Sequence, residues 1–281
     1  MKHLISFPGL NIDPFVLDPV AFNLFGRDVM WYGIIICVGM LLALLYASRL
    51  FKKEGFSEDD FFNLVVFLIP ISVISARLYY VIFDPTPNYN SFLDVIAIWR
   101  GGIGIYGAVI GGAITAVIFA KVTKKSVPKL LDCLAPAVMI GQIIGRWGNF
   151  MNAEAHGGIT ELPWRMGIAP YYEGVNYSSD FFVYYHPTFL YESLWNLLGF
   201  LIIHFFVVRN KKFDGQTSLS YLSWYGLGRG FIELLRTDSL EIFGLKVSAL
   251  VGFLSAIIFG SLLLINIIKT KKKEKKNGSN T

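Results

Sequence analysis

A short run of polar side chains stands where a hydrophobic stretch, residues 130–144, ends. The run GRWGNFMNAEAHG occupies residues 145–157 and carries one arginine, two carboxamides and one carboxylate, namely Arg146, Asn149, Asn152 and Glu154. Charged groups at membrane depth are costly and tend to mark function. A guanidinium binds phosphate or carboxylate oxygens through paired hydrogen bonds. The sequence therefore predicts an anion-binding site around Arg146.

A second polar group recurs along residues 225–236. Its members are Tyr225, Arg229, Glu233 and Arg236. At about 100° per residue in a helix, these positions fall within about 80° of one another and form one stripe. Glu192 and Tyr32 stand near the expected ends of two further helices. These groups are candidates to surround Arg146.

Buried arginines and glutamates often form ion pairs whose only role is to make the charges tolerable. For each residue alone, that structural role is the simpler interpretation. Taken together, however, the three arginines 146, 229 and 236 outnumber the two carboxylates of Glu192 and Glu233. Surplus positive charge suits an anionic ligand, and a phospholipid phosphate is the expected one in a membrane.

The amino-acid composition indicates the class of protein that contains these side chains. Hydrophobic residues make up 54% and charged residues 16% of the 281 residues, which is typical of a polytopic membrane protein. No basic cluster is interleaved with aromatic residues, so we expect no nucleic-acid partner. Cys37 and Cys133 both lie inside apolar runs, which argues against a disulfide framework or a metal site. We expect no metal and no cofactor.

Seven segments approach the roughly 20 apolar residues that a membrane-spanning helix needs. We therefore expect an all-α polytopic membrane protein. Residues 1–28 contain three prolines and are expected to lie along the membrane surface. Glycines between 101 and 112 lack a phosphate-loop lysine and predict close helix packing. The expected helices lie near 29–50, 61–83, 94–120, 129–150, 187–208, 216–236 and 246–268.

The basic residues predict the orientation. Sixteen of the 25 lysines and arginines follow the first, third, fifth and seventh segments, which places that side in the cytoplasm and the N-terminus outside. The polar groups then lie in the outer half of the membrane. Residues 1–268 form one transmembrane domain with a small extracytoplasmic cap at about 151–186, and residues 269–281 form a basic cytoplasmic tail. We expect packing or local hydrogen bonds for His204 and Asp132.

The run at residues 145–157 resembles the signature of the bacterial prolipoprotein diacylglyceryl transferase family, G-R-x-G-N-F-x-N-x-E-x-x-G. Four further stretches are similar to that family and occur in the same order. They are Trp31-Tyr32-Gly33, residues 99–102 leading to Tyr106-Gly107, residues 186–192, and residues 225–229 with Glu233 and Arg236. The resemblance covers nearly the whole chain.

The resemblance implies transfer of the sn-1,2-diacylglyceryl group of phosphatidylglycerol to the thiol of the lipobox cysteine of a preprolipoprotein. A thioether forms and glycerol phosphate leaves, in the first step of lipoprotein maturation at the bacterial plasma membrane. By position in the family motifs, Arg146 and Arg229 are the implied phosphate-binding pair. The residues implied to support the lipid head group are Asn149, Glu154, Gly157, Tyr32, Tyr225, Glu192, Glu233 and Arg236.

Tyr106 is a departure from the family pattern, because many members have a histidine there, which has been proposed as the base. The thiolate is the reacting form of cysteine, and a tyrosine with an unperturbed pKa of about 10 is a poor base at pH 7. Nearby arginines could make Tyr106 more acidic, Glu154 could take the proton, or the arginines alone could favour the thiolate. We expect Tyr106 to position the substrate.

Two other classes of protein share parts of this pattern. A transporter or receptor with an outward cavity would carry polar residues through the midplane to the cytoplasm. Another lipid enzyme, such as an acyltransferase, would need a nucleophile paired with a base. The charged groups here stop in the expected outer half, and no serine–histidine or cysteine–histidine pairing stands at a suitable depth. The sequence therefore favours the diacylglyceryl transferase.

Overall fold

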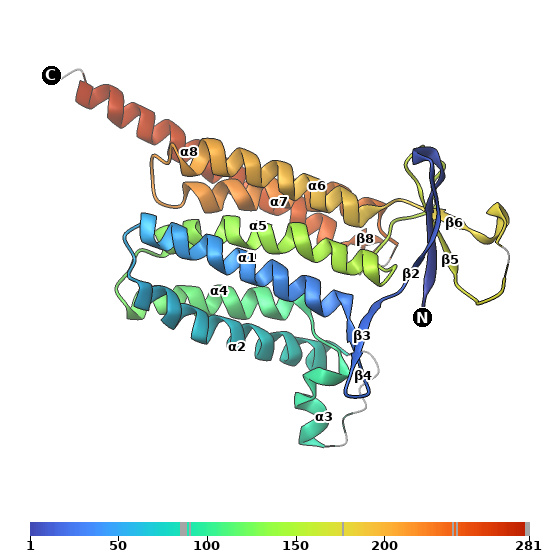
Figure 1. Ribbon diagram of the computed structural model, residues 1–281. Coiled ribbons are helices and arrows are strands. Elements are labelled where there is room, and N and C mark those ends of the chain that lie inside the picture. The colour runs from blue at the N-terminus through green and yellow to red at the C-terminus, as the bar shows by residue number, and fades with distance from the viewer. Residues whose placement is uncertain (85–88, 90, 176, 238, 240, 279–281) are drawn as a thin grey trace. The chain divides into compact units, whose positions relative to one another are not determined.

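The computed structural model describes residues 1–84, 89, 91–175, 177–237, 239 and 241–278 (Figure 1). Asn176 of the expected cap and residues 279–281 of the expected tail lie outside the described residues. The chain groups into two compact units, residues 1–46 with 134–281 and residues 47–133. Helices α1, Trp31–Lys53, and α5, Val127–Met151, each contribute residues to both units.

Within the described residues, six helices are long and apolar enough to cross a membrane. They are α1; α2, Glu58–Phe83; α4, Ile105–Val122; α5; α6, Thr188–Ile202, continued by the π-helical segment η4, Ile203–Val208; and α8, Val247–Gly278. A further long helix, α7, Gln216–Leu235, is more polar and is not among the six; it carries Tyr225, Arg229 and Glu233 of the predicted stripe. The sequence prediction agrees with these helices to within a few residues, apart from α4 and the longer α8.

The prediction of a helix near 94–120 was wrong at its start. The chain instead forms a short helix α3, Phe92–Ile96, a 3-10 turn η2, Ile98–Arg100, and an extended link to α4. Gly101 and Gly102 have φ angles of 84° and 74°, which lie outside the α-helical region and which glycine adopts at little cost. These two glycines therefore end the turn, and α4 begins only at Ile105.

Close packing of α2 against α4 builds the second unit. A Cβ atom added at Gly107 would lie 2.3 Å from the Ser75 carbonyl oxygen, and one at Gly111 would lie 2.2 Å from Ser75 Oγ. The expectation that these glycines allow close helix packing is confirmed. Arg77 of α2 fixes the turn before α4. Its guanidinium donates at 2.7 Å to each of the carbonyl oxygens of Asp94, Val95, Gly101 and Gly102.

The first unit contains strands, so the prediction of an all-α chain was wrong for part of it. An antiparallel sheet has the order β2-β1-β5-β6. Its strands are β1, His3–Phe7; β2, Ile12–Leu17; β5, Met166–Pro170; and β6, Val183–Tyr185. The 3-10 turns η1, Pro8–Leu10, and η3, Ser179–Phe181, lie between strands. The N-terminal residues thus pair with the expected cap.

The sheet is anchored to a helix by a hydrophobic cluster. Ile5, Phe7 and Leu17 of the first two strands pack with Met166 of β5 and Phe189 of α6. Because Phe189 stands in the first turn of α6, the sheet fixes the start of the helix that carries Glu192. Part of the strand structure thus serves to position a candidate site residue.

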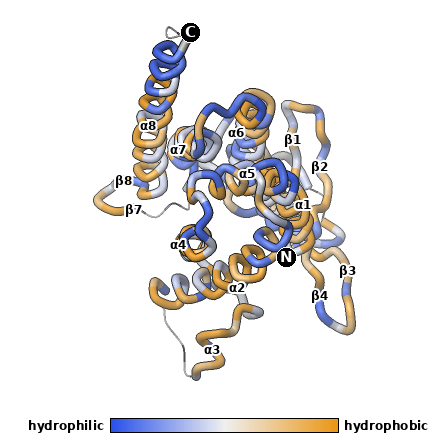
Figure 2. The backbone as a smooth tube through the Cα atoms, turned by 90° about the vertical axis from the view of Figure 1, so that its left-hand side faces the viewer, coloured by the Kyte–Doolittle hydropathy of each residue, from blue (hydrophilic) through white to orange (hydrophobic). Residues whose placement is uncertain are grey.

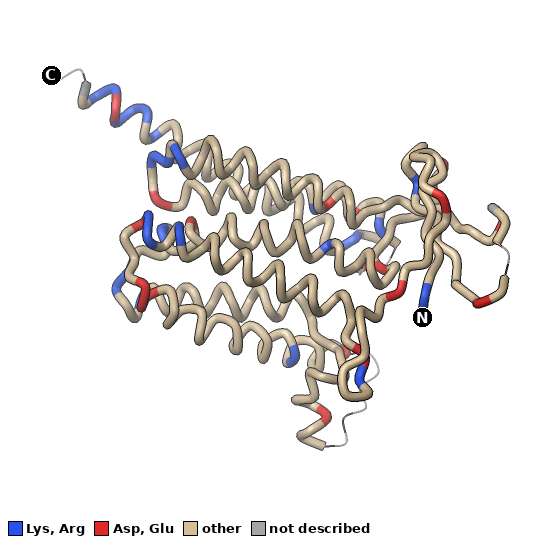
Figure 3. Tube along the Cα trace, viewed as in Figure 1, with Lys and Arg blue, Asp and Glu red and all other residues tan. Residues whose placement is uncertain are grey.

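Glycines also bring α7 and α8 together. A Cβ atom at Gly226 of α7 would lie 2.6 Å from the Gly252 carbonyl oxygen of α8, and one at Gly230 would lie 2.6 Å from a ring carbon of Phe253. Figure 2 shows hydrophobic residues along the body of α8 and hydrophilic ones at its C-terminal end, where Figure 3 places lysines. The charged end of α8 therefore projects beyond its apolar portion.

Two β-hairpins lead directly into helices of the first unit. Strands β3, Val20–Leu24, and β4, Arg27–Met30, precede α1. Strands β7, Glu241–Ile242, and β8, Leu245–Lys246, precede α8. Both hairpins are antiparallel.

Candidate active site

Three helices bring charged side chains together at Glu192 of α6. Arg146 of α5 donates from Nη2 to Glu192 Oε1 at 2.7 Å, and Arg229 of α7 donates from Nη1 to Glu192 Oε2 at 3.0 Å. The Glu192 side chain is only 3% exposed. One buried carboxylate therefore holds the two predicted phosphate-binding arginines around a common point.

The stripe on α7 continues this network. Arg229 Nη2 lies 2.5 Å from Glu233 Oε2, and Arg236 Nε lies 4.0 Å from the same oxygen. Lys246 of β8 donates from Nζ to the carbonyl oxygens of Glu233 at 3.3 Å, Leu234 at 3.1 Å and Arg236. A lysine at a helix C-terminus satisfies carbonyl groups that lack partners within the helix. Arg229, Glu233 and Arg236 of the predicted stripe thus form one connected series of contacts with a capped end.

The signature residues after Arg146 extend the network in the other direction. Arg146 Nη1 donates to Asn149 Oδ1 at 3.3 Å, and Asn149 Nδ2 donates to Glu154 Oε1 at 2.9 Å. Asn152 Nδ2 donates to the same Glu154 oxygen at 3.3 Å. The carboxamides therefore hold Glu154, while the arginines hold the other two glutamates.

Gly157 lies where the chain passes between two other segments of the site. Its N–H donates to the His186 carbonyl oxygen at 2.9 Å. A Cβ atom at this position would lie 2.7 Å from His186 Cβ and 2.9 Å from the Leu235 carbonyl oxygen. Any larger residue would separate the turn after α5 from the end of α7. Burial lowers the pKa of the His186 imidazole, which keeps it neutral at pH 7.

Two predicted tyrosines flank the network. Tyr32 of α1 packs on α5, because a Cβ atom at Gly148 would lie 2.9 Å from Tyr32 Cδ2. Tyr225 stacks on Tyr221 of the same helix, with 5.8 Å between the ring centres. Tyr225 stands one turn before Arg229 on α7. Tyr32 thus packs on the helix that carries Arg146, and Tyr225 belongs to the helix that carries Arg229.

The remaining residues named from the sequence lie elsewhere. Tyr106 stands in the first turn of α4 in the second unit, where its ring lies 6.1 Å from that of Tyr79. Its place in the site stays a prediction. His204 packs its ring on that of Phe200, as expected, with 5.7 Å between the ring centres. Its hydrogen bond is not local, because its Nδ1 lies 2.6 Å from Tyr46 Oη of α1. Asp132 is buried within α5.

Burial divides the charges of the site into two groups. The side chains of Arg146, Arg229 and Arg236 are 19%, 17% and 12% exposed, whereas Glu192 and Glu233 are each 3% exposed. Coulomb interactions strengthen as the effective dielectric constant falls. The buried glutamates therefore fix the arginines from within, and the arginines keep accessible edges for an anion.

The sequence model of the prolipoprotein diacylglyceryl transferase family matches residues 19–266. The chain belongs to this family. Relatives named phosphatidylglycerol–prolipoprotein diacylglyceryl transferase include a protein of Listeria innocua, 44% identical over 93% of both chains. The Finegoldia magna relative is 42% identical over 92% of this chain and 100% of its own. The Clostridioides difficile relative is 39% identical over 86% of this chain and 92% of its own.

Membership of the diacylglyceryl transferase family confirms the resemblance predicted from residues 145–157 and the four accompanying stretches. It makes the chain a transferase. It also decides against the transporter, receptor and acyltransferase interpretations that the polar residues alone left open.

Sequence reasoning missed two residues that position the candidate site. Ser193, beside Glu192, accepts from Trp147 Nε1 at 3.2 Å and donates to the Ile143 carbonyl oxygen at 2.9 Å. These bonds set α6 against α5. The sequence feature that could have identified Ser193 is a small polar residue inside an apolar segment. Lys246 was missed because it stands ten residues beyond Arg236, at the expected start of another helix.

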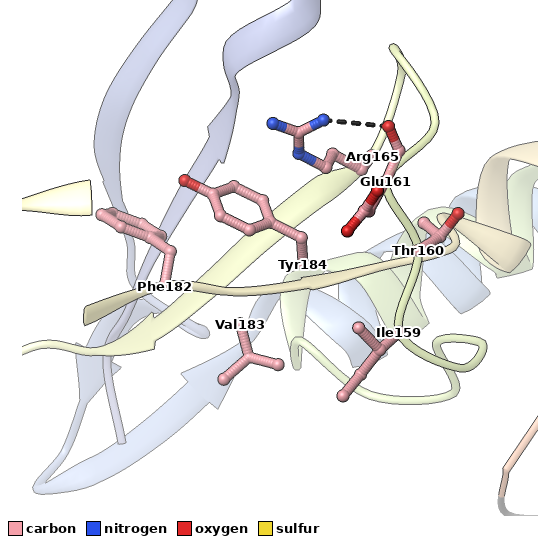
Figure 4. Close-up of a pocket in the computed structure, with 7 residues that line it drawn as sticks. All are labelled: Ile159, Thr160, Glu161, Arg165, Phe182, Val183 and Tyr184. Carbon is pink, nitrogen blue, oxygen red and sulfur yellow. Dashed lines mark hydrogen bonds between the residues drawn. The ribbon is translucent and has the colours of Figure 1, made fainter. Parts of the chain in front are cut away.

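A separate hollow lies between the loop that precedes β5 and strand β6 (Figure 4). Its volume is about 480 Å³, and its lining is Ile159, Thr160, Glu161, Arg165, Phe182, Val183 and Tyr184. Arg165 donates to the Glu161 carbonyl oxygen at 3.0 Å, and its guanidinium lies 4.8 Å from the centre of the Tyr184 ring. These contacts tie the loop before β5 to β6. The hollow has one arginine in its lining, whereas the Glu192 network has two arginines on one carboxylate.

Proposed function

We propose that the chain transfers the sn-1,2-diacylglyceryl group of phosphatidylglycerol to the lipobox cysteine of preprolipoproteins. The observation that carries this function is the meeting of Arg146 and Arg229, from two different helices, on the buried Glu192 carboxylate. This arrangement preorganises two cations near one point before any ligand arrives. The names of the relatives supply the two substrates.

The reaction places new negative charge on a phosphate. The cysteine sulfur attacks the carbon of the diacylglycerol moiety that is esterified to phosphate, so a carbon–sulfur bond forms and the bond between that carbon and the phosphate oxygen breaks. The electron pair of the broken bond stays on the phosphate oxygen, and glycerol phosphate leaves. The thiol proton passes to a base or to the departing phosphate. Fixed positive groups aimed at developing charge are often the largest catalytic contribution.

Arg146 and Arg229 suit this task. Each guanidinium has five N–H donors, so contacts with glutamates leave donors for phosphate oxygens. Because both side chains are partly exposed and Glu192 is not, a phosphate can bind from the accessible side without displacing the glutamate. We assign phosphate binding and leaving-group stabilisation to these two arginines.

The surrounding residues hold the head group and the arginines in place. Glu192 and Glu233 orient Arg229, while Asn149 connects Arg146 to Glu154. Gly157 permits the close turn beside α7. Tyr32, Tyr225 and Arg236 complete the proposed head-group site. Tyr106 positions the substrate, and the proton acceptor is Glu154 or the departing phosphate.

The membrane arrangement is part of the proposal. All seven long helices, α7 included, span the bacterial plasma membrane as one domain over residues 1–268. The N-terminus and the cap at about 151–186 lie outside, and the basic tail at 269–281 lies in the cytoplasm, as the distribution of lysine and arginine favours. The site then lies in the outer half of the bilayer, where exported preprolipoproteins and outer-leaflet lipid can both reach it.

The direct test uses purified protein in detergent with phosphatidylglycerol labelled in its diacylglyceryl glycerol. We expect label to move to a lipobox peptide and glycerol phosphate to appear in equal amount. A peptide with serine in place of the cysteine should stay unlabelled. Absence of transfer by well-folded protein would overturn the proposed function.

Removing either guanidinium tests the site. Arg146→Ala and Arg229→Ala should each lower the transfer rate at least about 1,000-fold, because the fixed charge on the leaving group is lost. Arg209→Ala, which changes an exposed arginine between α6 and α7, is the matched control and should keep wild-type activity. Normal turnover by either site variant would place the phosphate elsewhere.

A further inference from the structure

Two hairpins of the first unit have the same turn. In β3–β4, Leu24 pairs with Arg27, so Phe25 and Gly26 form a two-residue loop. In β7–β8, Ile242 pairs with Leu245, so Phe243 and Gly244 form the corresponding loop. The φ angles are 51° and 77° in the first loop and 50° and 74° in the second. Positive φ at both central residues is the requirement of a type I′ turn.

Phenylalanine is a poor choice for the first position of this turn. Asparagine, aspartate and glycine adopt positive φ most readily, whereas a bulky side chain there is a genuine outlier. The same unfavourable residue nevertheless occupies both tips. The phenyl rings therefore contribute something other than turn stability.

Both rings project away from the protein. Phe25 is 97% exposed and Phe243 is 101% exposed. Their neighbours Phe22, Leu24, Ile242 and Leu245 are also more than half exposed. Figure 2 shows largely hydrophobic colouring along β7–β8. Each hairpin thus presents an apolar edge whose tip makes almost no contact within the chain.

Chain continuity fixes where these tips can lie. Strand β4 ends at Met30 and α1 begins at Trp31, while β8 ends at Lys246 and α8 begins at Val247. Both helices are long and apolar enough to span a membrane. At about 3.3 Å per strand residue, the tips stand about 13 Å and about 7 Å along the chain from the helix starts. Both tips can therefore reach the boundary between lipid head groups and acyl chains, which interfacial segments enter with apolar side chains such as phenylalanine.

We propose that Phe25 and Phe243 are membrane anchors whose rings insert at this boundary. The partner of both hairpins is the lipid surface itself. A lipid environment removes the cost of exposing the rings to water, and burial of apolar area in the interface supplies the binding. This role is independent of the proposed transfer reaction.

The two hairpins are suited to hold the rings in place. Asn23 Nδ2 donates to Asp28 Oδ1 at 3.0 Å, and the Gly26 N–H donates to Asn23 Oδ1 at 3.0 Å, so the first tip is braced across its strands. In the second hairpin, Lys246 bonds to the carbonyl oxygens of Glu233 and Leu234. Anchoring of Phe243 therefore also holds the end of α7 that carries Glu233 and Arg236 near the lipid surface.

Depth measurements on the whole protein test the anchors. An environment-sensitive fluorophore is attached beside an intact phenylalanine tip, at Leu24→Cys or Leu245→Cys, with Cys37→Ser and Cys133→Ala removing the native thiols. The protein is reconstituted into phosphatidylcholine–phosphatidylglycerol vesicles. The exposed Glu173→Cys, in the cap, is the matched control. We expect a lipid-borne quencher to act several-fold more strongly at both tips than at position 173, and aqueous iodide to show the reverse. Tips that behave like position 173 would overturn the proposal.

A second variant separates the ring from the turn. Phe243→Asn creates the Asn-Gly pair that a type I′ turn favours, so the hairpin should form at least as well. A fluorophore at Leu245→Cys then reports the depth of the hairpin. We expect lipid quenching at position 245 to fall several-fold in F243N while the melting temperature in detergent is kept. Unchanged quenching would show that the phenyl ring is not the anchor.

Discussion

Helices α6 and α7 are joined in two chemically different ways. At one level, the buried Glu192 carboxylate accepts from Arg229, with Arg146 of α5 on its other oxygen. Less than one turn along α6, Trp195 stacks on Trp224 with 4.5 Å between the ring centres. The two joints therefore share the same pair of helices, and the comparison isolates what charge and shape each contribute.

The tryptophan joint is reciprocal. Trp195 Nε1 donates to the Trp224 carbonyl oxygen at 3.0 Å, and Trp224 Nε1 donates to the Trp195 carbonyl oxygen at 2.9 Å. Each ring covers a glycine one turn beyond the other tryptophan, because a Cβ atom at Gly199 or Gly228 would lie within 2.2 Å of an indole nitrogen. Shape and neutral hydrogen bonds thus fix this joint in one arrangement.

The ionic joint can do what the tryptophan joint cannot. Its arginines are held by charge and keep exposed edges. A ligand oxygen can therefore accept hydrogen bonds from them without any movement of a helix. The difference indicates that α6 and α7 are positioned by shape at one level so that charge can be used for binding at the next. Stability and activity should therefore respond separately to changes at the two joints.

The largest expected effect comes from breaking the ionic joint. In Glu192→Gln, the amide NH₂ meets guanidinium donors where a carboxylate oxygen accepted before. We expect the transfer rate to fall about 100-fold, because small displacements of positioned groups have effects of that size. The rate is measured per mole of folded enzyme, with melting recorded alongside. Glu173→Gln, on an exposed loop, is the control. A wild-type transfer rate for E192Q would show that Glu192 does not position the arginines.

Breaking the tryptophan joint should instead affect stability. In Gly199→Ala, the new Cβ would meet Trp224 Nε1 at 2.2 Å, and overpacking of this kind costs about 1–3 kcal/mol. We expect a lower melting temperature with near-normal transfer by the folded fraction.

A matched glycine supplies the control for that change. Apart from its chain neighbours and the backbone of its own helix, no described atom lies within 4 Å of a Cβ added at Gly141 of α5. Gly141→Ala should therefore leave melting unchanged or raise it, since alanine is the better helix former. Equal melting temperatures for G199A and G141A would contradict the steric account of the joint.

Helical periodicity made much of the site predictable. A rotation of about 100° per residue in a helix put Arg229, Glu233 and Arg236 on one stripe, and their contacts agree with this prediction. Periodicity within one helix does not set the register between helices. The bridging position of Glu192, and the role of Ser193 beside it, depend on how α5, α6 and α7 pack and could not be read from any single segment.

The strands show the same limit more strongly. β1 pairs with β2, which directly follows it, but also with β5, far along the chain. Local sequence does not identify this second partner, so the four-stranded sheet could not be predicted from it. The start of α4 is a different case. Gly101 and Gly102 were visible, but they were interpreted as packing glycines when their positive φ angles end the preceding turn. Gly107 and Gly111 do pack against α2, and composition alone does not distinguish the two uses of glycine.

The smallest expected effect tests whether the two glycines and two tryptophans act as a unit. Trp224→Phe removes the hydrogen bond to the Trp195 carbonyl oxygen, which should cost about 1 kcal/mol. The smaller ring also lacks the nitrogen that an alanine at position 199 would meet. Gly199→Ala should therefore destabilise W224F less than it destabilises the wild type. Melting of the two single variants and the double variant gives the coupling between the sites, expected at about 0.5–3 kcal/mol. Strictly additive effects would mean that the indole and the glycine do not constrain each other, and that the tryptophan joint is no more specific in shape than the ionic one.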